Sequence, residues 1–303
     1  MIYIRKEFVV ALLIAFLSVN TACQAQKSSV TDSGKAVDKK DKKKKKYKLP
    51  EIDLSHWSVT TPELNAKGGA MNVEPPAILE YAKDPRLIPY MYNDSTSGAL
   101  VFYAYPSDAT TANTKYSRSE LREQMVPGDN NTNWTFAQGA NMKGKLAMEE
   151  ITKGSDGKYH KAIIMQIHGR LTNEQRDLIG QKDNNAPPML KIYWQDGKVR
   201  VKTKVLKVLE ATGDQLLHEE MWGDDEGYTF KQEVGFGKFT LEVKISDGKM
   251  VVILNDSEYK VYENIHMKKW GVFENYFKAG NYFQSRDKGA FAKVKYYELE
   301  VSH

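Results

Sequence analysis

The chain has 303 residues, of which 41% are hydrophobic, and a formal net charge of +5. This length suits one large domain with an appendage, and the single cysteine excludes a domain held together by internal disulfides. Residues 1–48 carry 12 basic and 4 acidic side chains, which leaves 32 basic and 35 acidic ones, a net of −3, in 49–303. A domain with this balance can bind a polyanion only by concentrating positive charge locally.

Residues 1–23 are predicted to be an export signal. A positively charged start precedes an apolar run over 8–19, which is too short for a membrane-spanning helix. Cys23 stands where a bacterial lipoprotein is lipidated, although Asn20 replaces the usual aliphatic residue, and lipidation is favoured over simple cleavage after Ala25. We expect an outer-membrane or cell-surface lipoprotein, or otherwise a periplasmic or secreted protein, that touches a membrane only through the lipid.

Residues 24–48 are predicted to be a tether. The segment is polar, low in complexity and ends in a run of lysines, so it cannot bury enough apolar surface to fold. Lysine runs also occur in arms that bind nucleic acid. In an exported chain a solvated stalk is the better interpretation, and no nucleic-acid partner is expected.

Residues 49–303 are typical of one all-β domain. Segments in which polar and apolar residues alternate meet at Asp196-Gly197 and at Asp247-Gly248. An Asp-Gly dipeptide between such segments predicts a hairpin, because both central turn positions need positive φ. Helical periodicity is confined to two short segments, 75–81 and 172–179. This many antiparallel strands predict a β-jelly roll, a sandwich of two sheets, without a second domain or an internal repeat. We expect a monomer.

Two segments in the middle of the chain place polar side chains on one face of a strand, because successive side chains point to opposite faces. In 118–124 the alternate residues are Arg118, Glu120, Arg122 and Gln124. The apolar segment 162–169 ends in Gln166 and His168, and Ile167 between them faces the other way.

The segment 276–284 repeats this pattern near the C-terminus. Its polar face consists of Tyr276, Lys278, Tyr282 and Gln284, with a gap at Gly280. The apolar residues Phe277, Ala279 and Phe283 point into a core. If the three strands are neighbours in one sheet, their polar faces combine into a binding site.

Each motif alone has a simpler explanation. The first could be an ion-pair ladder on the surface, His168 could be a structural histidine, and Lys278 could protect an edge strand. The occurrence of all three together favours a functional site. The acidic triplet 224–226 is interpreted as a solvated loop, because it lacks the spacing of a calcium loop, and no motif for a catalytic metal is present.

The three segments resemble the signature blocks of alginate lyases of polysaccharide lyase family 7, in the same order. The blocks are Arg118-Ser119-Glu120-Leu121-Arg122, Gln166-Ile167-His168 and Tyr276-Phe277-Lys278-Ala279-Gly280-Asn281-Tyr282. The resemblance extends over 50–303. It implies a jelly roll whose concave sheet forms the substrate cleft, and cleavage of alginate by β-elimination without a metal or another cofactor.

The resemblance also implies roles for the residues. Four positions match the catalytic residues of the family: Arg118, Gln166, His168 and Tyr282. A guanidinium and an amide would neutralise the uronate carboxylate, so that the C5 proton can be removed. Tyr282 is expected to be the acid, and the base when the proton lies on its side, whereas His168 is the base for the opposite epimer, guluronate.

Five further residues are expected to bind substrate. Arg122 and Lys278 would bind the neighbouring carboxylates, and Glu120 would orient the two arginines. Tyr276 and Gln284 complete the set. In this family, isoleucine at the position of Ile167 is associated with guluronate-containing substrates.

Two other functions stay open at this point. A non-catalytic carbohydrate-binding module would use the same face, and a related lyase would act on another polyuronate such as glucuronan. Retention of both His168 and Tyr282 favours an enzyme, since binding needs neither an acid nor a base. The segments 170–189 and 210–230 are candidate walls of the cleft, on which endo or exo action depends.

Overall fold

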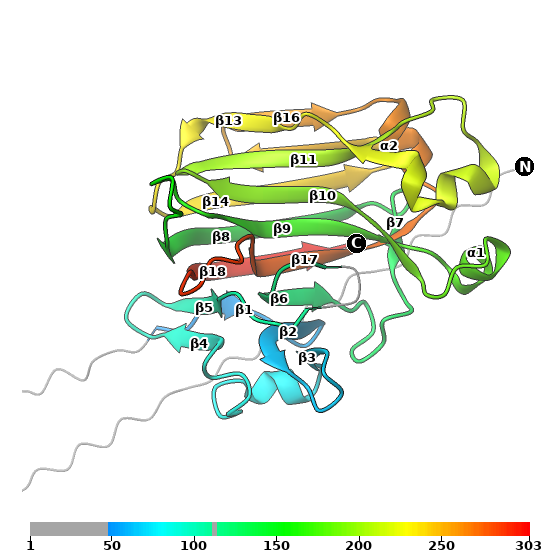
Figure 1. The fold of residues 1–303 in the computed structure, drawn as a ribbon. Helices are drawn as coiled ribbons and strands as arrows, with labels where there is room; N and C mark the ends of the chain where they lie inside the picture. The colour runs from blue at the N-terminus through cyan, green and yellow to red at the C-terminus, as the bar shows by residue number, and fades with distance from the viewer. Residues whose placement is uncertain (1–47, 111–113) are drawn as a thin grey trace, which may run out of the picture. The chain divides into compact units, whose positions relative to one another are not determined.

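The structure, a computed structural model, describes residues 48–110 and 114–303, which form a sandwich of two β-sheets (Figure 1). The predicted all-β class and two-sheet sandwich are confirmed. The predicted export signal, Cys23 and all of the predicted tether except Lys48 lie outside the described residues, and they stay predictions. Within the described part of the chain, no helix is long and apolar enough to cross a membrane.

One sheet has ten strands. Along the sheet their order is β12 (Trp222–Asp224), β11 (Lys198–Leu206), β10 (Asn185–Gln195), β9 (Lys161–Arg170), β17 (Glu274–Phe283), β6 (Arg118–Glu123), β2 (Trp57–Leu64) and β3 (Ala70–Val73). Two short strands lie off this path: β13 (Tyr228–Glu233) pairs with β11, and β7 (Trp134–Thr135) pairs with β17.

The second sheet has eight strands. Their order is β16 (Glu258–Tyr262), β15 (Lys249–Leu254), β14 (Phe239–Ser246), β8 (Ala140–Ile151), β18 (Ala292–Ser302), β5 (Ala99–Ala104) and β4 (Met91–Asp94). The remaining strand, β1 (Glu51–Ile52), pairs in parallel with β18, whereas the other strand pairs in both sheets are antiparallel.

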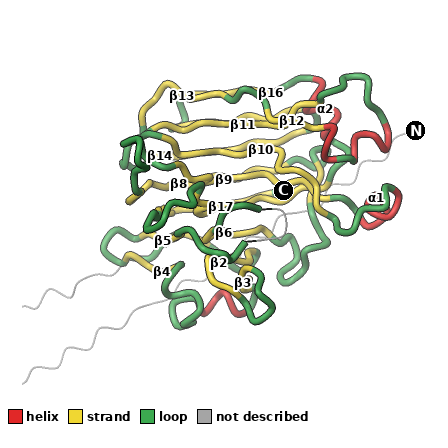
Figure 2. The backbone as a smooth tube through the Cα atoms, viewed as in Figure 1, coloured by secondary structure: helices red, strands yellow, loops and turns green. Residues whose placement is uncertain are grey.

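Helix is confined to short segments (Figure 2). They are α1 (Asn173–Leu178), α2 (Ile265–Trp270) and the 3₁₀ turns η1 (Ala77–Glu80), η2 (Gly213–Leu217) and η3 (Glu219–Met221). The two short helices predicted over 75–81 and 172–179 correspond to η1 and α1. Thr172 begins α1 with a capping box, in which its side chain and that of Gln175 satisfy each other's backbone N–H.

Both predicted hairpins are present, but their turns differ. Asp196 and Gly197 both have positive φ between β10 and β11. Between β14 and β15 only Gly248 does, so the expectation of positive φ at Asp247 is wrong. Glycine supplies the left-handed conformation there without strain on its neighbour.

Apolar side chains of both sheets fill the space between them. Phe277, Ala279 and Phe283 of β17 are buried in this core, as the sequence predicts, and so is Ile167 of β9. Each large apolar side chain buried in this way stabilises the fold by roughly 1.5–3 kcal/mol. The core therefore fixes which face of each strand is left for polar side chains.

Candidate active site

The three motif strands are neighbours in the ten-stranded sheet, with β17 between β9 and β6 (Figure 1). Lys278 pairs with Arg122 on one side and with Gln166 on the other. Tyr282 pairs with Arg118, and Tyr276 pairs with His168. Because directly paired residues point to the same face, the predicted polar faces combine into one surface.

Gly280 brings β17 and β6 close together at the centre of this surface. Its φ is +136°, and a Cβ atom there would lie 2.7 Å from the carbonyl oxygen of Ser119 and 2.9 Å from Cα of Glu120. A side chain at this position would push the strands apart. The two strands can thus approach each other closely only because Gly280 has no side chain, and this close approach lies directly beside Glu120.

Glu120 holds three of the motif side chains. Its buried carboxylate accepts hydrogen bonds from Arg118 Nη1 at 3.0 Å, from Lys278 Nζ at 2.7 Å and from Gln166 Nε2. Burial alone would raise the pKa of Glu120, but the charges of Lys278 and Arg118 and these hydrogen bonds outweigh it, and the pKa is lowered. A charged Glu120 therefore fixes the positions of all three donors.

Arg118 lies beside Tyr282 with one donor group free. Its guanidinium carbon is 3.8 Å from the centroid of the Tyr282 ring, a cation–π contact. Nη1 is bonded to Glu120, but the buried Nη2 has no hydrogen-bond partner among the residues that the structure describes. A buried donor of this kind is costly unless a ligand satisfies it.

The phenol of Tyr282 remains protonated at neutral pH. Burial raises its pKa above the ordinary value of 10.0, although the charge of Arg118 opposes this effect. The ring of Tyr116 contacts it edge to face at 6.3 Å, and Gln284 Nε2 donates to the Tyr282 carbonyl at 3.1 Å. A protonated phenol fixed from two sides can serve as a proton donor.

His168 is a neutral imidazole, and one of its two ring nitrogens forms a hydrogen bond to the backbone. Its Nδ1 lies 3.0 Å from the carbonyl oxygen of Gly169, so Nδ1 carries the proton and Nε2 keeps its lone pair. Burial and the charge of Lys278 lower the pKa of His168 to about 3. The ring stacks on Tyr276, with the centroids 5.2 Å apart and an interplanar angle of 15°. His168 is thus an oriented proton acceptor.

Lys278 and Tyr276 lie on β17 on the same face as Tyr282, opposite Gln166 and His168 of β9 respectively. Burial, followed by the charge of Arg118, lowers the pKa of Lys278 to about 8. Burial also raises the pKa of Tyr276, so this phenol stays neutral. Lys278 is consequently the cation of the site whose charge changes under mildly alkaline conditions.

Arg122 takes its position from groups that the sequence motif does not contain. Nη2 donates to the Asn130 carbonyl at 3.0 Å and to Asn133 Oδ1 at 3.1 Å, and Nη1 donates to the Glu123 carbonyl. Its guanidinium lies 4.1 Å from the ring centroid of Tyr276. The expectation that Glu120 orients both arginines is therefore correct for Arg118 only.

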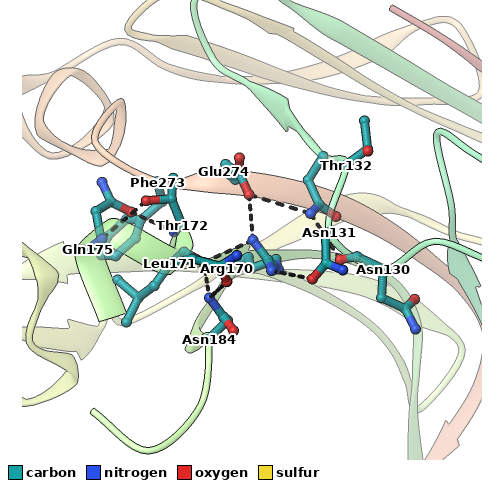
Figure 3. Close-up of polar contacts among 12 residues, drawn as sticks. Asn130, Asn131, Thr132, Arg170, Leu171, Thr172, Gln175, Asn184, Phe273 and Glu274 are labelled. Atoms are coloured by element: carbon teal, nitrogen blue, oxygen red, sulfur yellow. Dashed lines mark hydrogen bonds and ion pairs between the residues drawn. The ribbon is translucent and has the colours of Figure 1, made fainter. Parts of the chain in front are cut away.

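Arg170 and Glu274 extend the polar face and were not predicted (Figure 3). Arg170 Nη1 donates to Glu274 Oε2 at 2.8 Å, and Nη2 donates to Asn131 Oδ1 at 2.8 Å. The pair thereby ties the ends of β9 and β17 to the loop that holds Arg122. Alternation could have identified both residues, since Arg170 follows His168 by two positions and Glu274 precedes Tyr276 by two.

A bulge in β9 changes the face of its first residues. Met165 pairs with Ile192 of β10 and Ile163 with Tyr193, so Ile164 is an extra residue without a partner on β10. Ile164 and Met165 both belong to the core, and the buried hydroxyl of Tyr296 donates to the Ile164 carbonyl. Strict alternation would turn Lys161 away from His168, whereas the bulge puts both on one face.

The charge of the assembled site is positive. Glu120 pairs with Arg118 and Lys278, Arg122 has no carboxylate partner among the described residues, and Arg170 is paired with Glu274. The local concentration of positive charge expected for a domain of net negative charge is thus present. Among the described residues, no group of three His, Cys, Asp or Glu side chains could hold a metal ion.

The acidic triplet 224–226 is a solvated loop only in part: Asp225 and Glu226 lie in a loop and Glu226 is exposed, but two of the carboxylates have structural partners. Asp224 lies on β12 and forms ion pairs with Lys191 at 2.9 Å and Lys204 at 2.8 Å. Asp225 accepts hydrogen bonds from the backbone and side chain of Thr203. These carboxylates fasten β12 to the ten-stranded sheet.

A family model described as "Alginate lyase" matches residues 52–303 of this chain. An alginate lyase from Klebsiella pneumoniae is 24% identical over 286 residues, which cover 84% of this chain and 90% of the relative.

Solved structures of one enzyme are also similar to this chain. The crystal structure of alginate lyase A1-II′, a member of polysaccharide lyase family 7, is 30% identical, with a TM-score of 0.65 over 83% of this chain and 96% of that chain. A double variant of A1-II′ in complex with the substrate GGMG is 28% identical, with a TM-score of 0.64 over 83% and 94% of the two chains.

Proposed function

Because this chain belongs to the alginate lyases of polysaccharide lyase family 7, and so is a polysaccharide lyase, we propose roles for its site residues in the cleavage of alginate. Each role is taken from the residue at the matching position of the family. The proposed substrate is alginate, a polymer linked through 1,4-glycosidic bonds. The observation that carries the proposal is the free Nη2 of Arg118, which lies beside the phenol of Tyr282.

Arg118 neutralises the carboxylate of the uronate that is attacked. Removal of the C5 proton next to an ionised carboxylate would create a dianion, so a positive charge must first bind there. Arg118 offers Nη2 for this purpose while Nη1 stays on Glu120. Gln166, fixed by the same carboxylate, adds its amide, and Arg122 and Lys278 bind the neighbouring carboxylates.

Proton transfer then breaks the glycosidic bond. For guluronate, Nε2 of His168 takes the C5 proton, the C4–O4 bond breaks as the C4–C5 double bond forms, and the phenol of Tyr282 protonates the departing oxygen. For mannuronate, the phenolate form of Tyr282 takes the C5 proton, the C4–O4 bond breaks as the double bond forms, and the same oxygen then delivers that proton to the departing oxygen. The product carries a 4,5-unsaturated uronate at its non-reducing end. The guluronate reaction needs a neutral His168 and a protonated Tyr282, the forms that their shifted pKa values favour, whereas the mannuronate reaction requires Tyr282 to lose its proton first.

The direct test is to incubate the purified protein with alginate and to follow the ultraviolet absorbance of the unsaturated product. Membership of a lyase family favours turnover over the non-catalytic binding module. A parallel panel with glucuronan and other polyuronates tests the second alternative. Absorbance that rises only with glucuronan would reject alginate as the substrate.

We expect His168→Ala to impair cleavage of guluronate-rich alginate more than that of mannuronate-rich alginate. The imidazole is the base only for guluronate, and its removal should cost roughly 10²–10⁴-fold in turnover there. Initial rates on the two block types give the ratio. A guluronate preference in the unaltered enzyme is proposed on the same grounds, and equal losses on both blocks would contradict the role of His168.

We expect kcat/KM to fall as the pH rises through about 8, because Lys278 loses its charge there. Below that pKa the ammonium binds a uronate carboxylate, and above it a neutral amine cannot. His168 and Tyr282 do not titrate in this range, since the pKa of one is lowered and that of the other is raised. Lys278→Arg keeps its charge at high pH, so the alkaline fall of kcat/KM in this variant should move to higher pH. If the fall stayed at the same pH, a group other than Lys278 would be responsible for it.

A further inference from the structure

Three cations outside the sequence motifs lie on the same face of the ten-stranded sheet as the active site. Arg200 of β11 pairs with Tyr193 of β10, and Tyr193 pairs with Ile163 of β9. Ile163 in turn pairs with Tyr282, so this row of paired residues ends at the active site. Lys202 pairs with Lys191, the partner of Gln166. The bulge in β9 turns Lys161 to this face, and its ammonium lies 5.4 Å from the ring centroid of Tyr193. Lys161, Arg200 and Lys202 are called the outer cations below.

The outer cations lack carboxylate partners among the described residues. Asp224 neutralises Lys191 and Lys204 nearby, but no ion pair involves an outer cation in the part of the chain that the structure describes. Arg200 donates to the Thr229 hydroxyl at 2.8 Å and to the carbonyl of Glu226, which are both neutral. The positive charge of this surface therefore remains available to an anion.

The outer cations are also close enough to repel one another. Burial lowers the pKa of Lys161, and the charges of Lys202, Arg200 and Lys191 lower it further. Like charges gathered without counter-charges destabilise the unbound state, and an anionic ligand relieves the repulsion. Their arrangement is that of a binding surface for a polyanion.

This surface continues the active site across the sheet. A groove of about 280 Å³ begins beyond Tyr193, lined by Gln195, Asp196, Lys198, Arg200 and Thr229. Asp196 at its rim accepts a hydrogen bond from the Tyr159 backbone N–H at 3.2 Å. From β17 to β11 there are three strand spacings, roughly 14–15 Å. A chain seated with its scissile bond over Tyr282 reaches Arg200 only with sugars well beyond that bond.

We propose that Lys161, Arg200 and Lys202 form an additional binding region for the polyuronate chain, which takes the carboxylates of uronates remote from the scissile bond on one side. The proposal rests on the proposed function of the active site. It makes this region a determinant of chain-length preference, because a short oligosaccharide that fills the centre of the site cannot reach it.

The test compares Lys161→Ala/Lys202→Ala with a control that removes the same charge from the other sheet, Lys143→Ala/Lys145→Ala. For polymeric alginate we expect the KM of the first variant to rise about tenfold. For the shortest oligosaccharide that the enzyme cleaves, we expect the KM to rise less than twofold. In 1 M NaCl the difference for the polymer should nearly vanish, since the screening length falls from about 10 Å to 3 Å. The control variant should keep the KM of the unaltered enzyme.

Binding of polymeric alginate, measured by calorimetry in the Tyr282→Phe background, decides the proposal without turnover. A comparable weakening of about tenfold supports it. Unchanged binding, an equal rise of KM for short and long chains, or an equal effect of the control variant would overturn it. If the unaltered protein produced no unsaturated product from alginate, the proposed function would fail, while the binding comparison would still decide on the outer cations.

Discussion

Replacing Tyr282 by Phe is expected to lower kcat by roughly 10²–10⁴-fold, because it removes the group that we propose protonates the leaving oxygen. The phenyl ring keeps its place under the Arg118 guanidinium at 3.8 Å and its contact with Tyr116 at 6.3 Å. Affinity for alginate should therefore change by only a few-fold. Initial rates from the ultraviolet absorbance and calorimetric binding separate the two effects.

A matched control is Tyr259→Phe, which removes an exposed phenol from β16 in the other sheet. Its turnover should equal that of the unaltered enzyme. Turnover of Tyr282→Phe comparable to the control would remove Tyr282 from the mechanism. Loss of binding together with turnover would instead indicate that the hydroxyl positions the substrate.

The second large effect is expected for Glu120→Gln, which should lower the free energy of unfolding by ~3–5 kcal/mol. The side chain keeps its shape, but Arg118 and Lys278 are left as buried cations without a counter-charge. Turnover should fall as well, because one carboxylate oxygen becomes an NH₂ group that cannot accept, so Arg118, Gln166 and Lys278 no longer share one anionic acceptor. Chemical denaturation monitored by tryptophan fluorescence measures the change in stability.

The control for this change is Glu150→Gln, which breaks an exposed ion pair with Lys293 of the same kind, at 2.8 Å. An exposed pair contributes ~0–1 kcal/mol, so little loss is expected. If both variants were equally stable, the carboxylate of Glu120 would not be what holds the two cations in place.

Much of the site could be predicted because strand alternation is a local property. The faces of Tyr276, Lys278 and Tyr282, and the opposite face of Phe277, follow from period two alone. The hairpins at Gly197 and Gly248 follow from local turn chemistry. The pairings that bring Arg118, Gln166 and Tyr282 together join residues far apart in the sequence, and the motif resemblance rather than periodicity made their adjacency an expectation.

Other parts of the site could not be predicted because they depend on pairing. The hydrogen bonds of Arg122 to Asn130 and Asn133 require a loop folded against β6. The bulge at Ile164 is defined by the register of β9 against β10, and the Tyr296 hydroxyl of the opposite sheet donates to the Ile164 carbonyl there. Such features are set by contacts across the sandwich and leave no periodic signal.

The sequence by itself determined which chemical groups this protein brings to its site: three strands with a phenol, an imidazole and cations on one face, in the order of a lyase family. Only the tertiary structure decided that Glu120 binds three of these groups at once, that Gly280 lets the strands approach, and that Lys161 lies on the same face as the active site. The physical reason is the range of the interactions. The direction of a side chain follows from its own strand, whereas burial, register and bulges follow from residues far along the chain that pack beside it.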